Sequence, residues 1–70
     1  MKITETALEA ISNSIECRNA LALTFGKHTN SVDRWVSKKS KMYEIYLTHP
    51  KAVEQIMKYT GLTEGQILSK

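Results

Sequence analysis

The sequence predicts an all-α domain built from five short helices. Apolar residues recur every three or four positions in several stretches, which is the spacing of one helix face. Gly26 and Gly61 each follow such a stretch, and glycine is a common residue just past a helix end. A chain of 70 residues has room for one small hydrophobic core. We therefore treat residues 1–70 as a single domain.

The first helix is expected to begin at a threonine and to end near residues 12–14. Thr4 or Thr6 can cap it, because a threonine hydroxyl accepts a hydrogen bond from a free backbone N–H group. Residues 12–14 are two serines and an asparagine, which are weak helix formers. The apolar stripe of this helix consists of Ala7, Leu8, Ile11 and Ile15.

The second helix is expected over residues 15–25. Leu21 and Phe25 are four residues apart, so they share one face. The single cysteine, Cys17, is interpreted as a small, partly buried thiol. Gly26 would stop this helix in a left-handed conformation that other residues adopt at a cost.

The third helix follows a polar turn, with Thr29 or Asn30 as its N-cap. Its inward face consists of Val32, Trp35 and Val36, at positions i, i+3 and i+4. This spacing places the Trp35 ring in the core rather than against a nucleic-acid base. The opposite face is polar and consists of Asn30, Asp33, Arg34 and Ser37.

Two further helices are expected in the last third of the chain. Residues 42–47 fit either a helical turn or an extended segment, and we favour an irregular connector there. A helix follows Thr48 as N-cap and ends at Gly61, and Thr63 caps a short last helix. The buried face of the longer helix consists of Val53, Ile56 and Met57, and the last helix docks through Ile67 and Leu68.

The positive charge of the chain is concentrated in one window. The formal net charge is +3, and residues 27–41 carry five basic residues against one aspartate. Such a cluster is the electrostatic footprint of a surface that contacts phosphates. Lysines are also favourable at a helix C-terminus, so a solvated helix end is the alternative interpretation.

The sequence carries no sign of export or of membrane insertion. The N-terminus lacks the apolar core of a signal peptide, and no run approaches the roughly 18 apolar residues that span a bilayer. A single cysteine excludes an intramolecular disulfide, which fits a reducing compartment. We expect a cytoplasmic protein without a membrane partner.

Residues 18–37 resemble the helix-turn-helix motif of phage repressor and Cro-type DNA-binding domains. A small residue, Ala22, lies four positions before the turn glycine, Gly26. Val32 lies six positions after that glycine, and Trp35 lies nine after it. Lys27 departs from the family pattern, which often has an aliphatic residue at this position.

The resemblance implies a lambda-repressor-like domain whose second motif helix enters the major groove of double-stranded DNA. The matching base-reading residues are His28, Thr29, Asn30, Asp33 and Arg34. Phosphates would be met by Lys27, Ser31, Ser37, Lys38, Lys39 and Lys41. Asp33 could accept a hydrogen bond from cytosine or hold Arg34 in place. The family also implies a homodimer on a palindromic operator. We expect this dimer to repress transcription by occluding a promoter.

A second function class stays open. A small helical protein-interaction module, of the anti-repressor or antitoxin type, would use the same helix pair as a scaffold. We expect no enzyme activity, cofactor, metal or small-molecule ligand, because the chain is small and no nucleophile constellation or metal-ligand spacing is readable. The dimer surface is not readable either; its candidates are Tyr43, Tyr46, Leu47 and the final helix.

Overall fold

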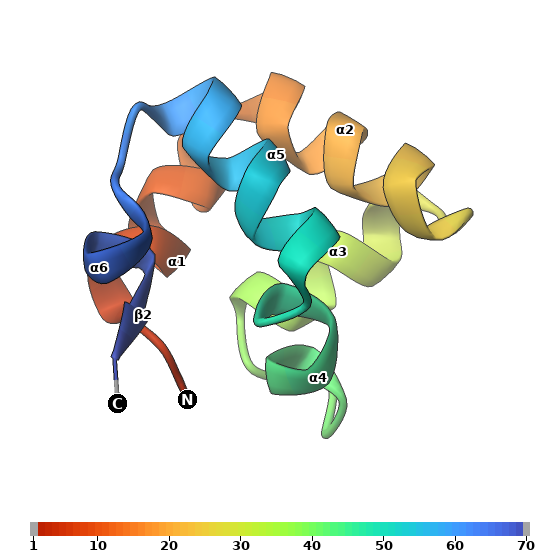
Figure 1. Cartoon of the computed structure of the whole chain (residues 1–70). Helices are drawn as coiled ribbons and strands as arrows, with labels where there is room; N and C mark the ends of the chain where they lie inside the picture. The colour runs from red at the N-terminus through yellow and green to blue at the C-terminus, as the bar shows by residue number, and fades with distance from the viewer. Residues whose placement is uncertain (1, 70) are drawn as a thin grey trace.

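The computed structural model describes residues 2–69, which form six helices and one two-stranded sheet (Figure 1). The helices are α1 (Glu5–Ser12), α2 (Ile15–Phe25), α3 (Thr29–Val36), α4 (Tyr43–Leu47), α5 (Pro50–Thr60) and α6 (Glu64–Ile67). The strands are β1 (Lys2–Ile3) and β2 (Leu68–Ser69). The predominantly helical class is therefore confirmed. The described residues form six helices where five were expected, and they add a small sheet that the sequence did not indicate.

The core lies where α1, α2, α3 and α5 meet, and α5 packs against α2. Side chains with no exposed surface come from every helix, and the largest are Ile11, Leu21, Val32, Leu47, Ile56 and Ile67. Cys17 is also fully buried in α2, and this burial raises the pKa of its thiol to about 11. The thiol is therefore a packing group that stays protonated at neutral pH.

The start of the chain follows the sequence pattern closely, apart from one residue. The Thr4 hydroxyl accepts a hydrogen bond from the Ala7 N–H group at 3.1 Å, and α1 ends at Ser12, as predicted. Ser14 caps α2 through a 3.2 Å hydrogen bond from the Cys17 N–H group. Because the helix is interrupted between Ser12 and Ile15, Ile15 is the first residue of α2, and it is 65% exposed. Its assignment to the buried stripe of α1 is wrong.

The turn after α2 confirms the role of Gly26. Its φ angle is +62°, in the left-handed region. The Lys27 N–H group donates to the Ala22 carbonyl at 2.8 Å, and the Gly26 N–H group donates to the Leu23 carbonyl at 3.2 Å. This pair of hydrogen bonds is the Schellman motif, which satisfies the last carbonyls of a helix.

The connector is more ordered than the sequence indicated. Residues 43–47 form α4, because Leu47 is fully buried and the Tyr46 ring packs on the core. His49, not Thr48, is the N-cap of α5: its Nδ1 atom accepts from the Lys51 N–H group at 3.1 Å. The Thr48 hydroxyl donates to the Glu44 carbonyl instead.

The buried face of α5 differs from the prediction at one position. Val53 and Ile56 are buried together with Ala52, whereas Met57 is 41% exposed. Positions 52, 53 and 56 form a narrow stripe along the helix. Position 57 lies beside position 53, just outside this stripe. The inclusion of Met57 in the buried face is therefore wrong.

The small sheet joins the two ends of the described chain (Figure 1). Strands β1 and β2 pair antiparallel, with Lys2 opposite Ser69 and Ile3 opposite Leu68. The Thr4 N–H group adds a 2.8 Å hydrogen bond to the Ile67 carbonyl. The sequence missed this sheet because two-residue strands have no periodicity to detect.

Candidate nucleic-acid interface

Helix α3 is held onto the domain by one buried face. Val32 has no exposed surface, and Trp35 is 3% exposed, so the prediction that Trp35 belongs to the core is confirmed. The Trp35 ring stacks on Tyr46 with centroids 4.3 Å apart, and it packs T-shaped with Phe25 with centroids 5.7 Å apart. Aromatic pairs in these arrangements contribute beyond their buried area. They fix the rotation of α3 about its own axis.

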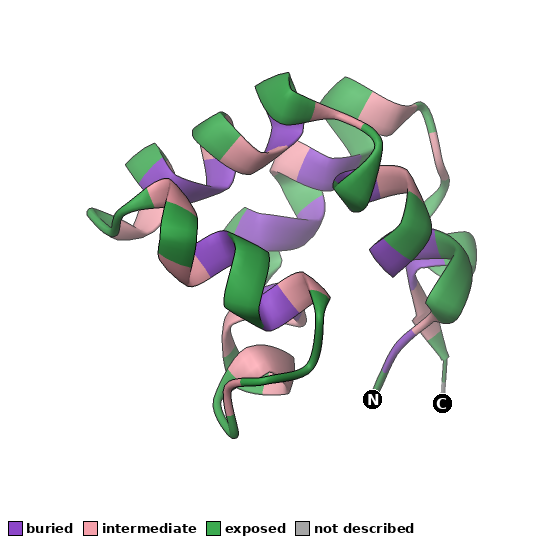
Figure 2. Cartoon of the chain, turned by 180° about the vertical axis from the view of Figure 1, so that it is seen from behind, coloured by how far each residue is buried: buried purple, intermediate pink, exposed green. Residues whose placement is uncertain are grey.

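The opposite face of α3 is open to solvent (Figure 2). Its exposed residues are Asn30, Asp33, Arg34 and Ser37, as the spacing predicted. Thr29 and Ser31 are half-buried at the flanks. These four residues are all exposed, so no other described helix or strand covers this face.

The amino end of α3 lacks the predicted cap. His28, rather than Thr29 or Asn30, is the N-cap residue, and its side chain makes no capping hydrogen bond. The turn after Gly26 places His28 in the extended backbone conformation that precedes a helix. Lys27 and His28 are both exposed beside this helix end.

The carboxyl end of α3 is closed by a second Schellman motif. Lys38 adopts a φ angle of +61°, which is unusual for a residue with a side chain. The Lys39 N–H group donates to the Arg34 carbonyl at 2.9 Å, and the Lys38 N–H group donates to the Trp35 carbonyl at 3.1 Å.

Lys38 has an ion-pair partner, whereas the other lysines of residues 27–41 have none among residues 2–69. Its Nζ atom forms an ion pair with the Glu5 carboxylate of α1. The hydrogen bond that Lys38 donates to Glu5 within this ion pair raises the pKa of Lys38. Lys27, Lys39 and Lys41 are exposed and have no ion-pair partner among residues 2–69.

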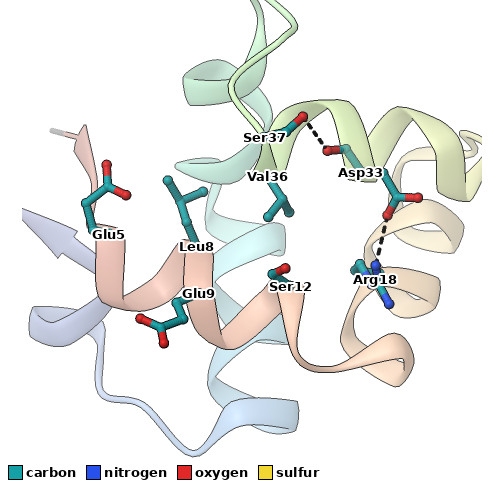
Figure 3. Close-up of a pocket in the computed structure, with 8 residues that line it drawn as sticks. All are labelled: Glu5, Leu8, Glu9, Ser12, Arg18, Asp33, Val36 and Ser37. Atoms are coloured by element: carbon teal, nitrogen blue, oxygen red, sulfur yellow. Dashed lines mark hydrogen bonds and ion pairs between the residues drawn. The ribbon is translucent and has the colours of Figure 1, made fainter.

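Asp33 pairs with α2 rather than with its neighbour on α3 (Figure 3). Its Oδ1 atom lies 3.2 Å from Nη1 of Arg18. The suggestion that Asp33 holds Arg34 is therefore wrong, and Arg34 has no ion-pair partner among residues 2–69. The Arg18–Asp33 pair lies at the edge of a hollow of about 460 Å³ between α1 and α3, where Glu9, Ser12 and Ser37 also lie.

The structure places most of the predicted site residues in two groups; His28, Thr29 and Ser31, near the amino end of α3, belong to neither. Asn30, Arg34 and Ser37 share the open face of α3, with Lys27, Lys39 and Lys41 exposed in the turns at its two ends. Asp33 and Lys38 are each held by an ion pair to another helix.

Sequence reasoning did not find the ion-pair partners Arg18 and Glu5. Glu5 lies 33 positions from Lys38, and Arg18 lies 15 positions from Asp33. Both separations exceed the local i,i+4 spacing at which charge pairs are readable in a sequence.

Comparison with protein-family models finds no matching family, and comparisons with curated proteins and with solved structures find no significant match. None of the helices within residues 2–69 is long and apolar enough to cross a membrane. In the same part of the chain, no three His, Cys, Asp or Glu side chains are grouped to hold a metal ion.

Proposed function

We propose that this chain is a sequence-specific double-stranded DNA-binding protein that regulates transcription. In this proposal, α2 and α3 form a helix-turn-helix motif of the repressor and Cro type, as the resemblance of residues 18–37 implies. The observation that carries the proposal is the uncovered polar face of α3, anchored from behind by Val32 and Trp35.

The size and chemistry of α3 suit the major groove. An α-helix with its side chains is about 10–12 Å across, and the groove is about 12 Å wide. Asn30 offers an amide that can bond to both N6 and N7 of adenine. Arg34 offers a guanidinium that can bond to O6 and N7 of guanine. Each such contact discriminates between bases by about 1–3 kcal/mol.

Three further predicted base readers differ in how freely they reach DNA. His28 is exposed beside the amino end of α3, and Thr29 is half-buried there. Asp33 is paired with Arg18, and this partner lowers the repulsion that an isolated carboxylate would exert on phosphates. A cytosine amino group is the base partner that an aspartate accepts from.

Phosphate contacts are assigned first to Lys27, Lys39 and Lys41, which are exposed without an ion-pair partner among the described residues. Lys38 must break its ion pair with Glu5 before it can bind a phosphate, so it contributes less to DNA affinity than the other three lysines. Ser31 and Ser37 can add neutral hydrogen bonds. Such contacts set affinity and orientation rather than sequence preference.

The mechanism we propose is occlusion of a promoter by a symmetric pair of these domains. One domain of this size makes few base contacts, and family members bind two half-sites about one helical turn apart. The operator would then be palindromic.

The test is selection of bound sequences from random duplex DNA, followed by fluorescence anisotropy on the selected sites. Arg34→Ala is expected to change which sequences bind. Lys39→Ala is expected to weaken all sequences alike and to reduce the salt slope by about one phosphate. Lys58→Ala on α5 is the matched control, because Lys58 lies outside α3 and its flanking turns. Failure to enrich any sequence contradicts the proposal, and so do equal losses for all three variants on an enriched site.

A protein-interaction module is the second candidate, and a specific observation favours it. Leu23 and Ile15 on α2 are 83% and 65% exposed, and they lie on the same side of that helix. Such a module would elute early from immobilised duplex DNA, and charge reversal at Lys38 and Lys39 would not change its elution.

A further inference from the structure

The solvent side of α2 carries a ridge that no described element covers. It consists of Ile15, Asn19 and Leu23, four residues apart along the helix. Ile15 is 65% exposed, Leu23 is 83% exposed, and Asn19 between them is exposed too. The outward turns of α2 lie along one edge of the molecule (Figure 2).

Hollows flank this ridge on both sides. Leu23 and Asn19 line one of about 470 Å³, whose far wall is Gln55 and Tyr59 of α5. Ala20 also lines this hollow, and its short side chain leaves room for an incoming group. On the other side, Ile15 and Asn19 line a smaller hollow of about 130 Å³ beside α3. The surface therefore has the ridge and the grooves that helix packing needs.

We propose that this ridge binds a second copy of this chain, with the two α2 helices antiparallel about a twofold axis at Asn19. The first reason is that the ridge has the same order of chemical groups in both directions: an apolar side chain, an amide and an apolar side chain. An antiparallel copy places Leu23 of one chain against Ile15 of the other, and it places the two Asn19 amides face to face. An amide has both donors and an acceptor, so two of them satisfy each other.

The second reason is the distribution of charge. Glu16 is exposed beside the ridge at the amino end of α2, and Lys27 is exposed just past its carboxyl end. An antiparallel pair brings Glu16 of one copy and Lys27 of the other to the same end of the helix pair. The twofold axis repeats this arrangement at the other end. The antiparallel pair also sets opposite ends of the two helix dipoles side by side. A parallel pair would oppose like charges instead.

The exposed apolar groups of the ridge are few, and stable interfaces bury at least about 1,200 Å² in total. We therefore expect a weak dimer, half-formed at a concentration between about 10 µM and 1 mM.

This interface differs from the dimer surfaces that the sequence suggested. Leu47 is fully buried, and Tyr43 and Tyr46 pack against the core. The inference does not rest on DNA binding, so it is tested with DNA absent. A chain that dimerises without binding DNA would contradict only the proposed function.

The first experiment is sedimentation equilibrium of the full chain from about 10 µM to 1 mM. Leu23→Asp is expected to weaken dimerisation at least ten-fold, because two buried charges would meet apolar groups. Ile45→Asp is the matched control: Ile45 is 60% exposed on α4, away from the ridge, and its change leaves the dimer unaffected. A native chain that stays monomeric throughout overturns the proposal, as do equal losses in the two variants.

The second experiment tests the twofold axis. Asn19→Cys places two thiols across the axis, and mild oxidation is expected to join them in an intermolecular disulfide. Ile45→Cys is the control, and it stays unlinked at the same concentration. The native Cys17 does not interfere, because it is fully buried. Equal cross-linking of the two variants, or none at position 19, overturns the antiparallel arrangement.

Discussion

Helices α2 and α3 are neighbours in the chain and in space, yet the surfaces that they expose to solvent differ in chemistry. Both bury an apolar face in the same core: Leu21 lies inside from α2 and Val32 from α3. Outside, α3 exposes amide, charged and hydroxyl groups, whereas α2 exposes the large apolar side chains of Leu23 and Ile15. The Gly26 turn sets the two surfaces at an angle to one another.

This difference indicates two kinds of partner. Polar groups that can form paired hydrogen bonds suit the edges of DNA bases, which are themselves hydrogen-bonding groups. Exposed apolar groups are stabilised by leaving water, so they suit another protein surface. One small domain can therefore hold a nucleic-acid face and a self-association face on adjacent helices. The predictions below test that division, beginning with the largest effect.

Loss of the anchor behind α3 is expected to cost the most. Trp35→Ala removes a ring that is 3% exposed and stacked on Tyr46, so we expect a loss of about 3–5 kcal/mol in the free energy of unfolding. Arg34→Ala, on the open face, should change stability by no more than about 0.5 kcal/mol. Urea titration followed by circular dichroism measures both. Similar losses in the two variants would mean that α3 has no distinct inner and outer faces.

The buried thiol of α2 is expected to make stability depend on alkaline pH. Burial raises the pKa of Cys17 to about 11, from an ordinary value near 9. Between these values the unfolded chain loses the thiol proton and the folded chain keeps it, so stability is complete below pH 9 and falls as pH rises. The loss reaches about 2–3 kcal/mol near pH 11.

Urea titrations at a series of pH values measure this slope. Cys17→Ala is the control, and it should show a shallower decline over the same range. An identical decline in the native chain and the variant would show that other groups are responsible. In keeping with a protonated thiol, iodoacetamide should label Cys17 only after unfolding.

The turn between the two helices should respond to substitution by about 1–2 kcal/mol. In Gly26→Ala the added methyl group meets no atom within 4 Å, so the expected loss comes from the left-handed backbone alone. Gly65→Ala is the matched control, because Gly65 lies in α6 without a positive φ. It should gain about 0.5–1 kcal/mol. Thermal unfolding separates the two, and a shift in the same direction would contradict the account of the turn.

The ion pair across α2 and α3 should have the smallest effect on stability. Arg18 and Asp33 are 28% and 51% exposed in their side chains, so Asp33→Asn should change stability by no more than about 1 kcal/mol. If α3 binds DNA, the same change removes a negative charge from its open face and raises affinity a few-fold at low salt. Anisotropy at two salt concentrations measures this. Weaker binding to all sequences would indicate that Asp33 orients the site rather than repelling phosphates.

The sequence predicted most of the fold where the signals were local. Caps at Thr4 and glycine stops at Gly26 and Gly61 involve residues within a few positions of each other, and these predictions are confirmed. The polar face of α3 was also predicted, because it depends only on helical periodicity. The order in residues 43–47 was missed, since α4 depends on the contact of its aromatic and leucine side chains with distant helices.

The sequence by itself determined the ends of the main helices to within about a residue, most of the apolar face of each, and where the positive charge lies. Only the tertiary structure decided which charges are neutralised, through Glu5 with Lys38 and Arg18 with Asp33. It also decided that Ile15 and Leu23 stay in water while Leu47 does not. The physical reason is that periodicity and capping act over one or two helical turns. Ion pairing and burial depend on which distant segments the folded chain brings together.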